Sequence, residues 1–133
     1  MDAGQQEEQK SRGTRNKELG RYGEECATHY LEKLGYDVIE RNWTCPAGEV
    51  DIIARQGDAI VFVEVKTRSS LSRGFPEEAV TPEKRSRYER IAAYYLKEYD
   101  ETELAVRFDV IGVLVLGPAK AMIKHHVSAF GVV

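Results

Sequence analysis

Apolar residues recur along the chain with two spacings, one typical of helices and one typical of strands. From about Asn16 to Leu34 they return every three or four residues, which predicts an amphipathic helix that ends at Gly35. A second helix is predicted to begin at Thr81, because threonine favours the N-cap and Pro82 suits the first helical position. The apolar positions are Leu19, Tyr22, Cys26, Ala27, Tyr30, Leu31 and Leu34 in the first helix and Val80, Tyr88, Ile91, Ala92, Tyr95 and Leu96 in the second.

Two β-rich runs surround a short polar turn and predict a hairpin. Val50–Ala54 and Ile60–Val65 are rich in β-branched residues, and Arg55-Gln56-Gly57-Asp58 separates them. The residues 42–48 before the hairpin are predicted to form a loop. The other predicted strands are Tyr36–Arg41, Leu104–Leu116 and Met122–Val127. The element order is therefore α-β-β-β-α-β-β, an α/β fold with a mixed central sheet and two covering helices.

Charged residues interrupt both strands of the predicted hairpin. Asp51 lies in the first strand, and Glu64 and Lys66 lie in the second, where a buried sheet is expected to be apolar. Side chains alternate faces with a period of two, so Glu64 and Lys66 share a face and hairpin pairing brings Asp51 near them. Ionised side chains are costly to desolvate unless they are paired or bind a metal. Mg²⁺ uses one or two protein carboxylates together with waters and substrate phosphate, so this pattern favours a divalent-cation site.

Each of these residues has an expected role. Asp51 and Glu64 are predicted to be metal ligands, with the Val65 carbonyl as a third ligand and Lys66 as the group that positions the attacking water. The alternative is a structural ion pair between Glu64 and Lys66, because an acid and a lysine two residues apart are a weak signal alone. The additional acid Asp51 favours the metal site. Glu49 is a secondary candidate, as an extra ligand or a charged neighbour.

Asp51, a dozen intervening residues and then Glu64-Val65-Lys66 resemble the signature of the PD-(D/E)xK nuclease superfamily, whose fold is that of type II restriction endonucleases. The wider sequence is similar to the YraN-like family of small bacterial proteins, relatives of the archaeal Holliday-junction resolvases. This resemblance covers about Asn16 to Phe130. The matching segments are Leu19-Gly20-Arg21-Tyr22-Gly23-Glu24, Leu34-Gly35-Tyr36, Arg41-Asn42-Trp43, Gly48-Glu49-Val50-Asp51, Val61-Phe62-Val63-Glu64-Val65-Lys66-Thr67-Arg68 and Arg107-Phe108-Asp109-Val110.

The resemblance implies a restriction-endonuclease-like core and a Mg²⁺- or Mn²⁺-dependent endonuclease acting on DNA, with branched or processed intermediates as candidate substrates. No separate DNA-reading domain is predicted, so strong sequence specificity is not expected. In the resembling families a glutamate of the first helix reaches the metal, and Glu24 is the matching residue. From its spacing alone, Glu24 is equally compatible with a solvated position at the helix flank. Resolvase-like relatives work as dimers, so the resemblance also implies a homodimer.

Basic residues concentrate just before and within the second predicted helix. Next to an acidic metal site they favour contact with a phosphate backbone. The alternative is a solvated helix face, in which Glu83 and Glu89 are the ionic partners. The predicted nucleic-acid-binding residues are Arg68, Arg73, Lys84, Arg85 and Arg87.

Composition limits these expectations only slightly. The 133 residues, of which 42% are hydrophobic, suffice for one domain over 16–133, while the polar residues 1–15 are expected to be a disordered tail. The net charge of -3 gives no general attraction to nucleic acid. No signal stretch and no run of about 18 apolar residues is present, so a cytoplasmic protein without a membrane partner is expected. A non-catalytic nucleic-acid-binding or protein-interaction module on the same fold is the alternative function, and a purely structural domain is a weaker one.

A few other residues have a structural and a functional interpretation. Trp43 is expected to pack in the core, the alternative being stacking on a base or sugar. Arg107 and Asp109 share a strand face and are expected to form a structural ion pair. His125 and His126 point to opposite faces of a strand, so they cannot bind one metal together and are expected at the surface.

Overall fold

A computed structural model describes residues 2–69, 81–99 and 104–130. The order of its helices and strands is the order that the sequence predicts, and the fold is α/β. The elements are α1 (Asp2–Lys33), β1 (Asp37–Cys45), β2 (Gly48–Gln56), β3 (Ala59–Arg68), α2 (Pro82–Leu96), β4 (Ala105–Gly117) and β5 (Lys120–Phe130).

Within the described residues, the five strands form one mixed sheet in the order β1-β2-β3-β4-β5. Neighbouring strands are antiparallel except β3 and β4, which run parallel. A parallel pair needs a crossover connection, and α2 lies in the segment that joins β3 to β4. The sheet thus places β3 at its centre, with a hairpin partner on one side and a parallel partner on the other.

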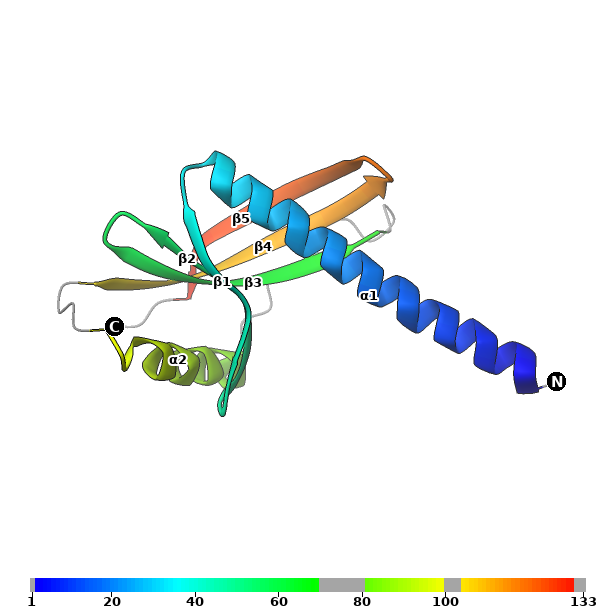
Figure 1. The fold of residues 1–133 in the computed structure, drawn as a ribbon, viewed down its shortest axis with the longest axis horizontal. Helices are drawn as coiled ribbons and strands as arrows, with labels where there is room; N and C mark the ends of the chain where they lie inside the picture. Colours follow the sequence, from blue (N-terminus) through cyan, green and yellow to red (C-terminus); the bar gives the residue numbers. More distant parts are fainter. Residues whose placement is uncertain (1, 70–80, 100–103, 131–133) are drawn as a thin grey trace.

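The two helices cover opposite faces of the sheet, so that the sheet is the middle layer (Figure 1). Each face carries its own buried apolar cluster, as expected for strands whose side chains alternate between two covered faces. No helix among the described residues is long and apolar enough to cross a membrane. The cluster beneath α1 contains Ala27, Leu31, Tyr36, Ile52, Ala54, Val61, Val63, Ile111 and Val113, and the cluster beneath α2 contains Val50, Ile53, Ile60, Phe62, Tyr88, Ile91, Ala92 and Phe108.

The ends of α1 differ in how well the sequence predicts them. At the C-terminal end Gly35 has φ of 89°, and the N–H groups of Gly35 and Tyr36 donate to the carbonyls of Glu32 and Leu31, a Schellman motif. The expectation of a disordered tail over residues 1–15 differs from the structure, in which α1 begins at Asp2 and its first half extends beyond the sheet (Figure 1). The physical reason is that Gln, Glu, Lys and Arg are good helix formers, so a helix anchored downstream continues through them.

The predicted loop over residues 42–48 is wrong except for a turn at Pro46-Ala47, because β1 continues to Cys45 and pairs with β2 from Cys45↔Gly48 onward. Polar residues and a proline make this stretch look irregular in the sequence. Within this stretch Asn42 is left-handed (φ 50°), a conformation that asparagine tolerates, and a register shift lies earlier in the strand, between Val38 and Glu40. The expected packing role of Trp43 is confirmed, since its ring meets Tyr95 edge-on at 5.1 Å.

Candidate metal and nucleic-acid site

The candidate site lies where β2 and β3 separate. The paired positions of these two strands run from Gln56↔Ala59 to Ile52↔Val63, and the next residues along the chains are Asp51 and Glu64. Beyond that point β3 continues beside β4 alone, with Glu64 opposite Val110. The two predicted metal ligands therefore stand on facing strands at the end of a shared ladder, as the hairpin register predicts.

Asp51 is held by the backbone that follows Glu64. Its Oδ2 accepts a hydrogen bond of 2.8 Å from the Val65 N–H. Burial raises the pKa of Asp51 to about 6, against the lowering effect of this hydrogen bond, and the carboxylates of Glu24, Glu64 and Glu49 raise it further. These four acids, Glu24, Glu49, Asp51 and Glu64, form what we call the acidic cluster.

Glu64 forms an ion pair with a lysine of α2. Its Oε1 lies 2.9 Å from Lys84 Nζ, and the two side chains are only 16% and 26% exposed. Lys66 follows two residues later on β3, so it lies on the same strand face as Glu64 and is half-buried. The sequence predicts Lys84 only as a phosphate contact. A contact between a helix and a strand that are far apart in the chain cannot be predicted from the spacing of residues.

Glu24 is brought to the site by a close contact between α1 and β3. A Cβ atom at Gly23 would overlap the Thr67 side chain, so only glycine allows the helix to lie this near the strand. Glu24 follows directly, and its Oε2 accepts a hydrogen bond of 3.2 Å from Asn42 Nδ2. The negative charge of Glu24 contributes to the raised pKa of Asp51, which is why we include it in the acidic cluster.

The predicted basic residues do not form one exposed surface in the described part of the chain. Arg85 is exposed, whereas Arg87 is half-buried against Tyr88, with its guanidinium carbon 5.6 Å from the ring centroid. The Arg87 Nε is buried and has no hydrogen-bond partner among the described residues. Arg68 is half-buried at the end of β3, and Arg73 lies outside the described residues.

Tyr88 is a further member of the site that the sequence assigned only to the core. Burial raises its pKa above the ordinary value, and the negative charges of Glu64 and Asp51 raise it further. The hydroxyl, which is protonated at neutral pH in any tyrosine, thus stays protonated to higher pH here. The spacing of apolar residues along α2 predicted that Tyr88 is buried. It did not predict that Tyr88 lies near Glu64 and Asp51, because spacing identifies the buried face of a helix but not the polar groups that this face contacts.

Asp51 and Glu64 offer the carboxylate oxygens that a hard divalent cation prefers. In the ranges 2–69, 81–99 and 104–130, no group of three or more Asp, Glu, His or Cys side chains is placed so that it could hold a metal ion. Mg²⁺ does not require one, because it commonly takes one or two carboxylates and fills its octahedron with waters and substrate phosphate. Asp51 and Glu64 supply that number, and the raised pKa of Asp51 reflects its burial first and the neighbouring carboxylates second.

Comparison with known proteins identifies the family. A family model described as Uncharacterised protein family UPF0102 matches residues 23–113, which is more than half of the chain. The chain belongs to this family. A UPF0102 protein of Beutenbergia cavernae is 50% identical over 107 residues, which cover 80% of this chain and 91% of the relative. The UPF0102 protein GSU0650 of Geobacter sulfurreducens is 45% identical over 115 residues, which cover 86% and 90%. The family that the sequence motifs indicated is thus confirmed.

A second polar cluster in this UPF0102 chain surrounds Asp109 on β4. Asp109 is buried and accepts hydrogen bonds from Arg107 Nε at 2.9 Å and from the Ser128 N–H at 3.0 Å, so the expected ion pair with Arg107 is present. The surface position expected for His125 is wrong, because its side chain is 6% exposed, with Nε2 2.8 Å from Asp109 and Nδ1 3.1 Å from the Tyr30 hydroxyl. The cluster ties α1 to β4 and β5, which is a structural role.

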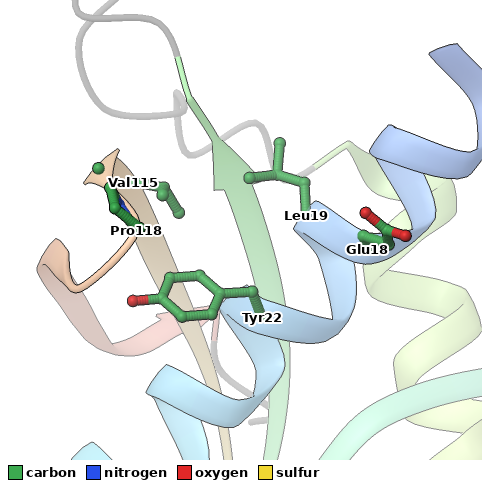
Figure 2. A pocket seen from close by; sticks show the side chains of 6 residues that line it. Glu18, Leu19, Tyr22, Val115 and Pro118 are labelled. Atoms are coloured by element: carbon green, nitrogen blue, oxygen red, sulfur yellow. The ribbon is translucent and has the colours of Figure 1, made fainter. Parts of the chain in front are cut away.

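Cavities along α1 are separate from the acidic cluster. Figure 2 shows Leu19 and Tyr22 of α1 beside Val115 of β4 and Pro118 just after it, and these residues line a cavity of about 340 Å³. Tyr22 also lines a neighbouring cavity of about 370 Å³. No member of the acidic cluster lines either of them.

Proposed function

We propose that this UPF0102 chain is a Mg²⁺- or Mn²⁺-dependent endonuclease that cuts DNA without strong sequence specificity. One observation carries the proposal: Asp51 and Glu64 stand on facing strands just past their last paired positions, where burial, with a further contribution from the neighbouring carboxylates, raises the pKa of Asp51 to about 6. Such a concentration of partly desolvated negative charge favours binding of a divalent cation. The in-strand acids and Lys66 also match the signature of the nuclease superfamily that the sequence resembles.

Each residue has a role in this proposal. Asp51 and Glu64 would hold the metal, with the Val65 carbonyl as a third ligand and Glu24 as an additional acidic group from α1. A bound divalent ion supplies Lewis-acid polarisation of the phosphate and lowers the pKa of an attacking water. Lys66 would orient that water and stabilise the negative charge that develops on the phosphate.

The basic residues around α2 would bind the DNA backbone. Arg85 is exposed, so its guanidinium can donate to phosphate oxygens, whereas the Nε of Arg87 is buried and its contact with DNA would need the side chain to move. Arg68, Arg73 and Lys84 complete the proposed set. The net charge of -3 means that binding would depend on this local group of cations, and affinity should fall steeply with salt.

A cleavage assay tests the proposal. Branched and single-stranded DNA substrates are incubated with Mg²⁺ or Mn²⁺ and either wild type, Asp51→Asn, Glu64→Gln or the control Asp58→Asn, which changes an exposed turn residue. We expect cleavage by wild type and by the control, and a loss of about 100-fold or more in each site variant, because each removes a charged ligand. Circular dichroism would establish that the variants remain folded. Cleavage retained in both site variants would refute the proposal.

One observation favours a second candidate, a nucleic-acid-binding module without turnover. The 2.9 Å ion pair between Glu64 and Lys84 neutralises a proposed ligand with the protein's own cation. A module of this kind would bind DNA equally well in wild type and Asp51→Asn, and neither would cut it with either metal. A gel-shift titration run beside the cleavage assay distinguishes the two candidates.

A further inference from the structure

The ion pair between α2 and β3 points to a coupling between metal binding and substrate binding. We propose that Lys84 is a resident counter-ion of Glu64, that a divalent cation displaces it, and that the released ammonium then binds a substrate phosphate. This inference rests on the proposed function, since it assigns a second task to a residue of the same site.

The first step is that Lys84 is placed for this contact by the helix start. Thr81 caps α2, and its Oγ1 accepts a hydrogen bond of 3.1 Å from the Lys84 N–H. The Arg85 N–H donates at 3.0 Å to the Thr81 carbonyl, which closes the first turn of the helix. These two hydrogen bonds fix the backbone of Lys84 in the first turn of α2. From there its side chain reaches Glu64, with Nζ 2.9 Å from Oε1.

The second step is that the Lys84 ammonium contacts the same Glu64 carboxylate that would bind the metal. Both partners are largely covered, so the attraction between them is screened less than that of a surface pair. A dication bound to Glu64 would repel an ammonium group on the same carboxylate. Lys84 and the metal therefore compete for Glu64, and metal affinity in the absence of substrate is lower than the acidic cluster alone would give.

The third step concerns the displaced lysine. Its backbone stays in the first turn of α2, beside the site, and its ammonium then lacks the carboxylate partner that it has in this structure. A phosphate oxygen beside the metal would replace that partner, because an ammonium group is a good point-charge ligand for phosphate. Metal and DNA would thus each strengthen the binding of the other, as linkage requires.

The test is a Mn²⁺ titration by calorimetry on the full chain, with and without a short DNA duplex. The variants are Lys84→Met, which keeps the length of the side chain, Lys84→Gln in case the first is poorly folded, and the control Lys97→Met, which changes an exposed lysine at the other end of α2. Without DNA we expect Lys84→Met to bind Mn²⁺ about 5- to 10-fold more tightly than wild type, and Lys97→Met to bind like wild type. The duplex should tighten Mn²⁺ binding in both proteins, because its phosphate completes the metal shell, but by a larger factor in wild type, where Lys84 also binds the phosphate.

The outcomes separate this inference from the proposed function. Mn²⁺ binding that Asp51→Asn abolishes, but that is equal in wild type and Lys84→Met, would overturn the counter-ion role and leave the metal site standing. Mn²⁺ binding by none of the proteins, with or without the duplex, would overturn both. A ¹⁵N chemical shift of Lys84 Nζ that moves when Mg²⁺ is added to wild type would support displacement directly, whereas an unchanged shift in metal-loaded protein would contradict it.

Discussion

Replacing Asp51 by asparagine is expected to stabilise the metal-free protein while it removes the proposed metal site. The carboxylate is partly buried among Glu24, Glu49 and Glu64, so its ionisation is unfavourable in the folded state. Asparagine is nearly the same size and keeps an oxygen that can accept the hydrogen bond from the Val65 N–H. The substitution therefore removes the unfavourable charge and retains most of the local packing.

The pKa shift sets the size and the pH dependence of this effect. A rise from 3.8 to about 6 corresponds to at most about 3 kcal/mol, at about 1.4 kcal/mol per pH unit. Asp51 remains partly accessible to solvent, so a gain of about 1–2 kcal/mol is the realistic expectation. Because the raised pKa favours the protonated form in the folded state, the wild type loses this stability as the pH rises from about 4 through 6. The variant should be more stable than wild type at about pH 8 and no more stable at about pH 4.

Urea unfolding followed by circular dichroism measures the difference, with Asp58→Asn in the exposed turn as the matched removal of one carboxylate. The control should change the free energy of unfolding by less than about 0.5 kcal/mol at either pH. If Asp51→Asn is no more stable than wild type at about pH 8, the charge repulsion inferred at the site is wrong. An equal gain at both pH values would attribute the effect to packing rather than to ionisation.

Two further predictions concern the contacts that place the site. Gly23→Ala should destabilise the protein by about 1–3 kcal/mol in urea unfolding, because the new methyl group would overlap Thr67. Gly20→Ala, whose methyl group would have nothing within 4 Å, should stabilise it by about 0.5–1 kcal/mol. Equal effects of the two substitutions would contradict the close contact of α1 with β3. Burial alone would raise the pKa of Asp109, but hydrogen bonds from His125, Arg107 and the Ser128 N–H lower it. Asp109→Ala should therefore lose about 3–5 kcal/mol at neutral pH and progressively less below pH 3.8, where protonation removes the same charge from wild type. A loss below about 1 kcal/mol in thermal and urea unfolding would show that this cluster is dispensable.

The regular elements and the two facing acids were predictable because local patterns encode them. The three- and four-residue spacing marks α1 up to Gly35, and the threonine–proline pair marks the start of α2. Strand alternation places Glu64 and Lys66 on one face, and hairpin pairing places Asp51 and Glu64 directly after the last paired residues of the two strands. These relations depend on residues that are close in the chain.

The contacts that could not be predicted are those between the helices and the sheet. Lys84 reaches Glu64 from a different layer, and His125 is buried because α1 covers β5 through Tyr30. Neither distance has a counterpart in sequence spacing. The extension of β1 through Asn42 was missed because its polar residues have the composition of a loop. The left-handed residue and the register shift that the strand contains have no periodic signal in the sequence.

Mn²⁺ binding is the measurement that tests the metal site most directly. Calorimetry in the presence of a short DNA duplex, which supplies the phosphate that such sites use to complete the metal shell, compares wild type with the double variant Asp51→Asn/Glu64→Gln. We predict one Mn²⁺ bound per wild-type chain and none bound by the double variant. Equal binding by both proteins, or binding by neither, would contradict the metal site formed by Asp51 and Glu64.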